Sequence, residues 1–324
     1  MPLQSSTTLT IPDVYRIGYE NAIRQAIQQT DERFAGMSTV ASDWNENQYV
    51  ASELVKQDWV TNNTRLGTTN PTEVTFGERS GFKQKVEWER IIDKWDEKLL
   101  GDLGDPTNAI LTAAASGLKR KRDALFIAAL TADALTGELP HTTSYAFPAA
   151  NIIAVGDVPL GINAGGTTAL GMTPGKIMNA LRKMEEADVD MNSNQLFLAM
   201  GPRQKQDLIE YSQVYKNDVW AQQAMDWLNN PGTKLFGHNV QPILSNRLSL
   251  SAANVRTCVL FAKEAMVTSP FEHRPYMSVE STRKYNLQLA QYGLWGVYRL
   301  YDELVYQILC DEDTAPSGTL ATTY

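Results

Sequence analysis

The chain has 324 residues, 43% of them hydrophobic and 20% charged, so it is ordinary globular material that is long enough to bury a sizeable core. Its formal net charge of -8 excludes a protein that wraps nucleic acid through a basic surface. No apolar run approaches the roughly 18 residues of a membrane span. Cys258 and Cys310 lie far apart and follow no signal peptide, so we expect a reducing compartment and no disulfide framework.

The first dozen residues are rich in Ser and Thr and have little to pack, so we expect an arm that is ordered only when something else holds it. An amphipathic helix is predicted from Pro12 to about Ala35, with Gly36 as its terminator.

Residues 51–84 read as a long β-hairpin with a polar, turn-rich centre and too few apolar residues for a core of its own. A two-stranded ribbon is marginal alone in water, so it needs a surface to lie on. The following run, Lys83–Ile92, alternates Val86 and Trp88 with charged residues. This alternation predicts a half-buried strand.

The longest predicted element is a helix over residues 106–136, ~46 Å long at about 1.5 Å per residue. Asp105 suits the N-cap, Pro106 suits the first helical position, and Gly137 follows the last apolar residue. Apolar residues recur between them at three- and four-residue spacing and form a continuous stripe. We interpret the four cations Lys119–Arg122 as a solvated run, in which at least one residue lies near the stripe and must reach water or an acidic partner.

Residues 138–172 have little periodicity and are expected to form short strands or a long excursion. A compact α+β unit is predicted from a helix capped by Thr173 to about residue 270. Its predicted strands are Leu196–Met200, Val240–Leu244 and Thr257–Phe261. Aromatic residues and alternation over Tyr276–Cys310, clearest in Val305–Cys310, predict long strands that return to the domain of the long helix.

A search for chemistry finds no catalytic, metal-binding or cofactor-binding arrangement. Gly171–Ile177 departs from a phosphate loop in its glycine spacing and in Ile177, and is interpreted as a loop and helix cap. The histidines and the acidic terminus form no ligand or nucleophile pattern, and Cys258 fits a buried strand position; the residues concerned are His141, His238, His273 and Asp311-Glu312-Asp313. The acidic run is interpreted as a solvated terminus, because successive carboxylates on an extended chain point to both sides.

Two stretches carry a resemblance to a known family. Ile92–Lys98 running into Gly117–Leu130 is similar to a (V/I)DKLDE run followed by a Gly-(Arg/Lys)-Lys-x-Asp-x-hydrophobic stretch, although Trp95 stands where Leu is more common. The end of the chain, Gly296–Leu300 with Val305–Glu312, is similar to the last strand of the same proteins. With the order of elements, these stretches resemble the major capsid protein of tailed bacteriophages, which has the Hong-Kong-97-like shell fold.

The resemblance implies an α+β shell fold in five parts. They are an N-terminal arm (1–50), an extended β-hairpin loop lying over a neighbouring subunit (51–84), a peripheral domain with the spine helix 106–136 (85–172), an axial domain (173–270), and the return strands of the peripheral domain with the C-terminal tail (271–324).

The resemblance also implies a structural protein, not an enzyme, that self-assembles into pentamers and hexamers of an icosahedral capsid around a double-stranded DNA genome. The expected place is the virion capsid, after assembly in the bacterial host cytoplasm. The expected partners are other copies of the chain, a scaffolding protein, the portal and a decoration or cement protein. Contacts with packaged DNA are expected to be weak and non-specific, and no membrane is involved. A separate scaffolding protein is expected because no long helical pro-segment precedes Pro12.

Six charged or aromatic residues are the candidate contacts between subunits: Lys56, Trp59 and Arg65 in the hairpin, and Glu87, Glu89 and Arg90 near its base. The alternative is that each of these residues lies on a solvated edge of the protein and contacts no other subunit. Two other functions remain at this point. An encapsulin-like compartment has the same architecture without a genome, and a soluble hydrolase requires one of the histidines to meet a nucleophile in space.

Overall fold

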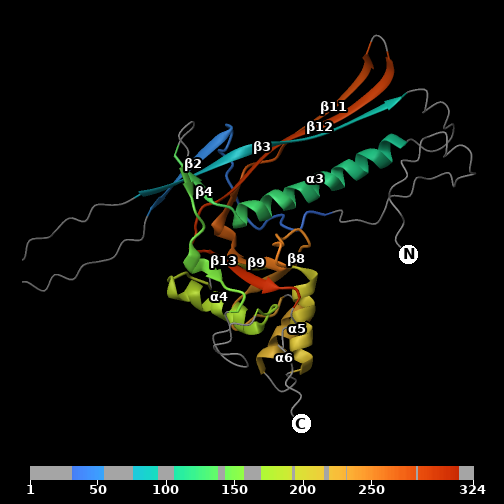
Figure 1. Cartoon of the computed structure of the whole chain (residues 1–324). Coiled ribbons are helices and arrows are strands. Elements are labelled where there is room, and N and C mark those ends of the chain that lie inside the picture. The colour runs from blue at the N-terminus through green and yellow to red at the C-terminus, as the bar shows by residue number, and fades with distance from the viewer. Residues whose placement is uncertain are drawn as a thin grey trace, which may run out of the picture. The chain divides into compact units, whose positions relative to one another are not determined.

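The computed structural model describes residues 31–54, 76–93, 106–137, 143–156, 169–191, 194–214, 219–230, 232–281 and 284–313. The chain is an α+β protein that divides into two compact units (Figure 1). The first unit comprises residues 1–32, 84–122 and 271–295, and the second comprises residues 33–83, 123–270 and 296–324. Three elements continue from one unit into the other: the helix α3 (Pro106–Thr131) and the strands β3 (Phe76–Asp93) and β12 (Lys284–Arg299).

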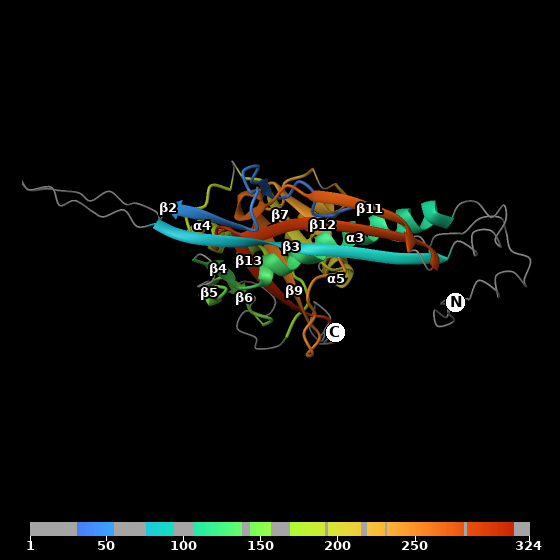
Figure 2. The ribbon, with the colours of Figure 1, turned by 90° about the horizontal axis from the view of Figure 1, so that it is seen from above.

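The first unit contains a long antiparallel hairpin of β11 (Glu272–Ser281) and β12. The hairpin begins at the pair Glu272 and Leu294, and its register shifts between Val279 and Ser281. Strand β3 lies beside β12 (Figure 2). Along β3, Val86 and Trp88 are half-buried whereas Lys85, Glu87 and Glu89 are exposed, so the predicted half-buried strand is confirmed.

The second unit is built on a sheet with the strand order β6-β13-β9-β7-β8. The strands are β6 (Ile152–Ile153), β13 (Val305–Asp311), β9 (Val255–Ala262), β7 (Leu196–Met200) and β8 (Val240–Leu244). All five residues of β7 are buried, because helices cover both faces of this sheet.

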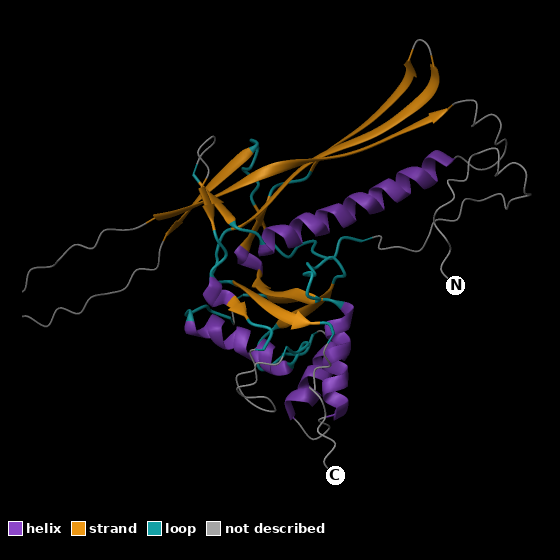
Figure 3. Cartoon of the chain, viewed as in Figure 1, coloured by secondary structure: helices purple, strands orange, loops and turns teal. Residues whose placement is uncertain are grey.

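The helices α4 (Pro174–Glu186), α5 (Pro202–Val214) and α6 (Val219–Asn229) lie on the opposite side of this sheet from the end of α3 (Figure 3). The end of α3 packs through Phe126, whose ring centroid lies 5.9 Å from that of Phe261 on β9. Phe197 on β7 extends this aromatic contact, with its centroid 5.4 Å from Phe261. The buried aromatic residues therefore join the helix to the central strands.

Short strands complete the second unit: β1 (Thr39–Val40), β2 (Gln48–Leu54), β4 (Ala134–Thr136), β5 (Thr143–Tyr145) and β10 (Met266–Thr268), with 3-10 turns at Ala149–Asn151 and Lys263–Ala265. Trp44 is buried here, with its ring centroid 5.6 Å from that of Tyr298 on β12. A Cβ atom at Gly296 would lie 2.4 Å from Trp44 Cη2, and one at Gly81 would lie 2.8 Å from the same atom. Only glycine at these two positions leaves room for the indole.

Strands β2 and β3 pair antiparallel from Gln48 and Phe82 to Leu54 and Phe76, so the base of the predicted hairpin is confirmed. Its residues 55–75 lie outside the described part of the chain. The helix predicted over 12–35 falls almost wholly on residues 1–30, which are also outside the description, and residues 31–35 are not helical.

The spine helix predicted over 106–136 ends at Thr131, and Ala134–Thr136 forms β4 instead. Arg299 Nη1 donates to the carbonyl of Leu130 in the last turn of α3, at 3.1 Å, and to that of Ala132 just after it, at 2.7 Å. These carbonyls therefore accept from a side chain of β12 and not from a further turn of helix. Strand β4 pairs with β3 and β5, and Gly137 follows it with a φ of 86°. Strand pairing therefore outweighs the local helix propensity of this stretch.

The long strands predicted over Tyr276–Cys310 are present as β11, β12 and β13, and their return to the domain of the long helix stays a prediction. The strand β13 pairs with β9, from Val305 and Phe261 to Asp311 and Val255. Six of its seven residues are buried, because it is an inner strand with neighbours on both sides. The alternating sequence of β13 does not indicate that both of its faces are buried.

Candidate functional site

The cationic run Lys119–Arg122 on α3 binds the first residues that the structure describes, Asp31 and Glu32. Two of its members form ion pairs within the first unit: Lys119 with Asp31 at 3.4 Å and Arg122 with Glu32 at 2.8 Å. The Arg122 guanidinium also lies over two aromatic rings, 4.9 Å from the centroid of Phe271 and 4.8 Å from that of Trp295. The pair of Lys119 is solvent-exposed, so the prediction of a solvated run is wrong only for Arg122 of these two residues, which has the acidic partner expected near the stripe.

In the second unit Asp123 binds the next residues of the chain, Arg33 and Phe34. Its side chain is buried, and Oδ1 accepts hydrogen bonds from the backbone N–H groups of Arg33, at 3.0 Å, and Phe34, at 3.3 Å. Phe34 stacks on Phe126 one turn further along α3, with centroids 5.1 Å apart. A buried charge-assisted hydrogen bond and an aromatic stack thus fix the chain to the helix at one point.

A second buried charge cluster lies where β3, the end of β12 and the β4–β5 hairpin meet. Asp302 binds two guanidinium groups, Arg79 at 2.7 Å and Arg299 at 2.6 Å. The guanidinium of Arg79 lies 4.7 Å from the centroid of the Tyr145 ring, and that of Arg299 lies 4.6 Å from the centroid of the Phe147 ring. Through Arg79, the Asp302 carboxylate binds β3 at the base of the β2–β3 hairpin. Through Arg299, which also donates to the carbonyls of Leu130 and Ala132, it is joined to the end of α3.

A cavity of about 970 Å³ opens beside this cluster in the second unit. Six acidic residues contribute to its lining: Glu78, Asp188, Asp190, Glu264, Asp302 and Glu303. Arg79 is a basic residue among the lining residues, and Asp302 already binds it. The described residues contain no group of three or more His, Cys, Asp or Glu that could hold a metal ion.

A family model described as "Phage capsid protein" matches residues 11–312, which is most of the chain. The chain belongs to the phage capsid protein family. It is a structural, non-enzymatic protein of the capsid shell, and neither the encapsulin nor the hydrolase alternative is favoured. A comparison with curated proteins finds no significant match.

Solved phage capsids share the fold of this capsid protein at low sequence identity. The capsid of the cyanophage P-SCSP1u matches with a TM-score of 0.62 and 12% identity, over 95% of this chain and 96% of that one. The head of Helicobacter pylori bacteriophage KHP40 matches with 0.61 and 12%, over 91% and 96%. The capsid of Ralstonia phage GP4 matches with 0.60 and 12%, over 95% and 98%. The predicted α+β phage capsid fold is confirmed, and the Hong-Kong-97-like description fits it.

The structure describes only part of the predicted contact set of this capsid protein. Lys56, Trp59 and Arg65 lie outside the described residues, and so does the side chain of Arg90. Glu87 is exposed and pairs with Lys85 at 2.8 Å, and Glu89 is exposed as well. Their contacts with another subunit stay a prediction.

The residues considered for chemistry have structural partners where they are described. His238 Nε2 lies 3.2 Å from Glu185 Oε1, whereas His141 and the side chain of His273 lie outside the description. Burial raises the pKa of the Cys258 thiol, as expected for a buried small residue. The side chain of Thr173 accepts a hydrogen bond from the Lys176 N–H, so the loop and helix cap are confirmed.

The prediction of a solvated acidic terminus is wrong for Asp311 and Glu312, whereas Asp313 is exposed as predicted. Asp311 is buried at the end of β13. Glu312 forms an ion pair with Arg256 on β9, and Asp313 accepts a hydrogen bond from Asn254 at 2.9 Å. Because β13 is an inner strand, it carries the Asp311 carboxylate into the protein. No described helix is long and apolar enough to cross a membrane.

Proposed function

We propose that this capsid protein forms pentamers and hexamers, and that these close into an icosahedral shell around the double-stranded DNA genome of a tailed phage. The observation that carries the proposal is the match of the phage capsid family model over residues 11–312. The likeness in fold to phage capsid chains, over 96% of the cyanophage P-SCSP1u chain and 98% of the Ralstonia phage GP4 chain, also supports the proposal.

We further propose that residues 1–50 act as the arm, 51–84 as the loop over a neighbouring subunit, 85–172 as the peripheral domain, 173–270 as the axial domain, and 271–324 as the return strands of the peripheral domain with the C-terminal tail. Lys56, Trp59, Arg65, Glu87, Glu89 and Arg90 are the proposed contacts of the loop. The anchor at Asp123 holds two residues of the proposed arm, Arg33 and Phe34, on the helix.

The proposed partners are a scaffolding protein, the portal and a decoration or cement protein, with assembly in the host cytoplasm. The net charge of -8 supports weak and non-specific contact with packaged DNA, because like charges repel. Tight, salt-sensitive binding of free subunits to duplex DNA would contradict this part of the proposal.

The test is expression of the full chain with and without its neighbouring genes, followed by negative-stain microscopy and sedimentation. We expect uniform polyhedra when the neighbouring genes are present, and free pentamers, hexamers or irregular particles when the chain is alone. Correctly sized shells from the chain alone would refute the need for a scaffolding protein. A monomer or dimer under every condition would refute the shell.

A further inference from the structure

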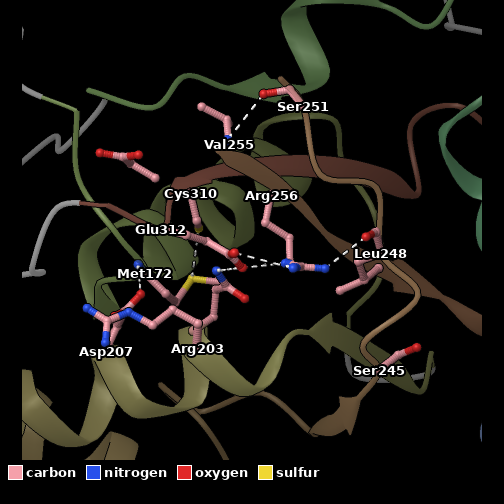
Figure 4. Close-up of polar contacts among 12 residues, drawn as sticks. Met172, Arg203, Asp207, Ser245, Leu248, Ser251, Val255, Arg256, Cys310 and Glu312 are labelled. Carbon is pink, nitrogen blue, oxygen red and sulfur yellow. Dashed lines mark hydrogen bonds and ion pairs between the residues drawn. The ribbon is translucent and has the colours of Figure 1, made fainter. Parts of the chain in front are cut away.

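Three sulfur atoms from three segments meet inside the second unit. Cys258 on β9 lies opposite Ile308 on β13, so Cys310, two residues further along β13, points to the same face of the sheet as Cys258. The two thiols share a hydrogen bond. Met172, just before α4, completes the group, with its Sδ 3.8 Å from Cys310 Sγ (Figure 4). Met172, Cys258 and Cys310 are called the sulfur cluster below.

The sulfur cluster is closed to solvent and weakly bonded. All three of its side chains have no exposed surface. The Cys310 thiol has a further acceptor in the carbonyl of Ile308, at 3.8 Å. Burial raises the pKa of Cys258, although the backbone N–H of Gly201 also binds its sulfur. The partners that the structure gives the two thiols are therefore weak ones, and sulfur lone pairs are available inside the protein.

A buried cation lies close to the sulfur cluster. Lys176 on α4 is fully buried, and its Nζ donates to the carbonyls of Leu170 and Leu309, at 2.7 and 2.8 Å, neither of which carries a charge. Burial lowers the pKa of this ammonium group, and the two thiols of the cluster oppose that change more strongly than Asp207 and Asp311 do. The positive charge is thus placed where negative charge on the sulfurs would balance it.

We propose that the sulfur cluster is a binding site for a monovalent soft metal cation such as Cu⁺. Thiolate and thioether sulfurs are the ligands that Cu⁺ prefers. Three sulfurs that bind one metal ion in a plane, with bonds of about 2.3 Å, stand about 4 Å apart. The distance of 3.8 Å between Cys310 Sγ and Met172 Sδ is close to this spacing. The described residues contain no group of three His, Cys, Asp or Glu for a metal ion, and here the third ligand is a thioether.

Binding exchanges two protons for the metal ion. Each thiol loses its proton to solvent and forms a bond from sulfur to Cu⁺, while Met172 donates a lone pair and no atom is oxidised or reduced. Two thiolates and one Cu⁺ carry a single negative charge, which the Lys176 ammonium group neutralises. A divalent ion such as Zn²⁺ leaves an uncompensated positive charge in the buried site and also favours four ligands. The charge balance therefore favours a monovalent ion.

The test is retention of metal by the full chain. The chain is refolded from urea with Cu⁺ under anaerobic, reducing conditions, because the sulfurs are closed to solvent in the folded state, and loosely held metal is removed with a weak chelator. We expect one Cu⁺ per chain, with the ultraviolet absorption of a Cu⁺–thiolate bond, and no Zn²⁺ in a parallel experiment. Absence of retained Cu⁺, or equal retention of Zn²⁺, would overturn the proposal.

Variants assign the ligands. Cys310→Ser is expected to abolish retention, and because both cysteines of the chain belong to the cluster no other thiol competes. Met172→Leu keeps the side-chain volume and is expected to weaken Cu⁺ binding by roughly tenfold or more, measured by competition with a coloured Cu⁺ chelator. Met266→Leu is the matched control, since Met266 is equally buried but lies on β10 in the other sheet, and its affinity is expected to equal that of the wild type.

Met172→Leu also decides the matter if Cys310→Ser does not fold. Equal affinities of Met172→Leu and Met266→Leu for Cu⁺ would overturn the proposal, because the metal would then bind without the third sulfur. Retention of Cu⁺ by Cys310→Ser at the level of the wild type would overturn it as well.

Discussion

Replacing Asp302 by alanine is expected to lower the free energy of unfolding by about 3 kcal/mol or more. The change leaves two guanidinium groups without their carboxylate, and one of them, Arg299, is only 2% exposed. Arg299 also binds the last carbonyls of α3, so the end of the spine helix loses its support together with the base of the hairpin. Urea unfolding of the unassembled full chain measures the loss.

The matched control is Glu303→Ala, which removes the neighbouring carboxylate from an exposed position on the rim of the same cavity. We expect this change to stay within about 0.5 kcal/mol of the wild type. Equal effects of the two substitutions would show that loss of any acidic residue from this rim has the same result, and would contradict the role of Asp302 as the shared partner.

Trp44→Ala is expected to cost about 3–5 kcal/mol, because it removes a large buried ring and leaves a cavity. The ring packs between Tyr49 and Tyr298, which come from different strands of the second unit. The same unfolding experiment measures this loss.

A double-mutant cycle with Gly296→Ala tests the packing directly. The three heavy atoms nearest to a Cβ at Gly296 all belong to Trp44, at 2.4, 2.5 and 3.1 Å. Gly296→Ala alone is therefore expected to destabilise the chain by about 1–3 kcal/mol through overpacking. In the Trp44→Ala background the methyl group has space. The double variant should therefore be destabilised by less than the sum of the two single costs. Additive costs would mean that the indole does not exclude a side chain at Gly296.

Local signals in the sequence predict several elements to within a residue or two. The strands Leu196–Met200 and Val240–Leu244 have the predicted bounds, because turn residues flank short apolar runs. The cap at Thr173 and the start of the spine helix at Pro106 are found in the same way.

Errors arise where a distant segment decides the structure. The spine helix stops at Thr131 because Arg299, far along the chain, binds its carbonyls and because the next residues pair with β3 and β5. The local pattern of helix-forming residues does not indicate that the helix ends at Thr131. The partner of β13 is missed for the same reason, since an alternating sequence is compatible with an exposed edge and with a buried inner strand.

The charge clusters are harder still to predict. Asp123 and Asp302 each act through partners that lie tens to hundreds of residues away. The available signal is a single acid next to apolar residues, as where Asp123 precedes Ala124-Leu125-Phe126. Such a residue must find a partner when buried, but the sequence does not identify the partner. The loop contacts Lys56, Trp59 and Arg65 rest on the family resemblance and stay predictions.

Cryo-electron microscopy of particles assembled from this chain tests the central claim most directly, because it traces residues 1–30 and 55–75 in the shell. The account predicts a closed shell of pentamers and hexamers in which residues 55–75 lie on a neighbouring copy, with Lys56, Trp59 or Arg65 in the contact. A chain that stays monomeric, or a shell in which residues 55–75 contact only their own subunit, would contradict it.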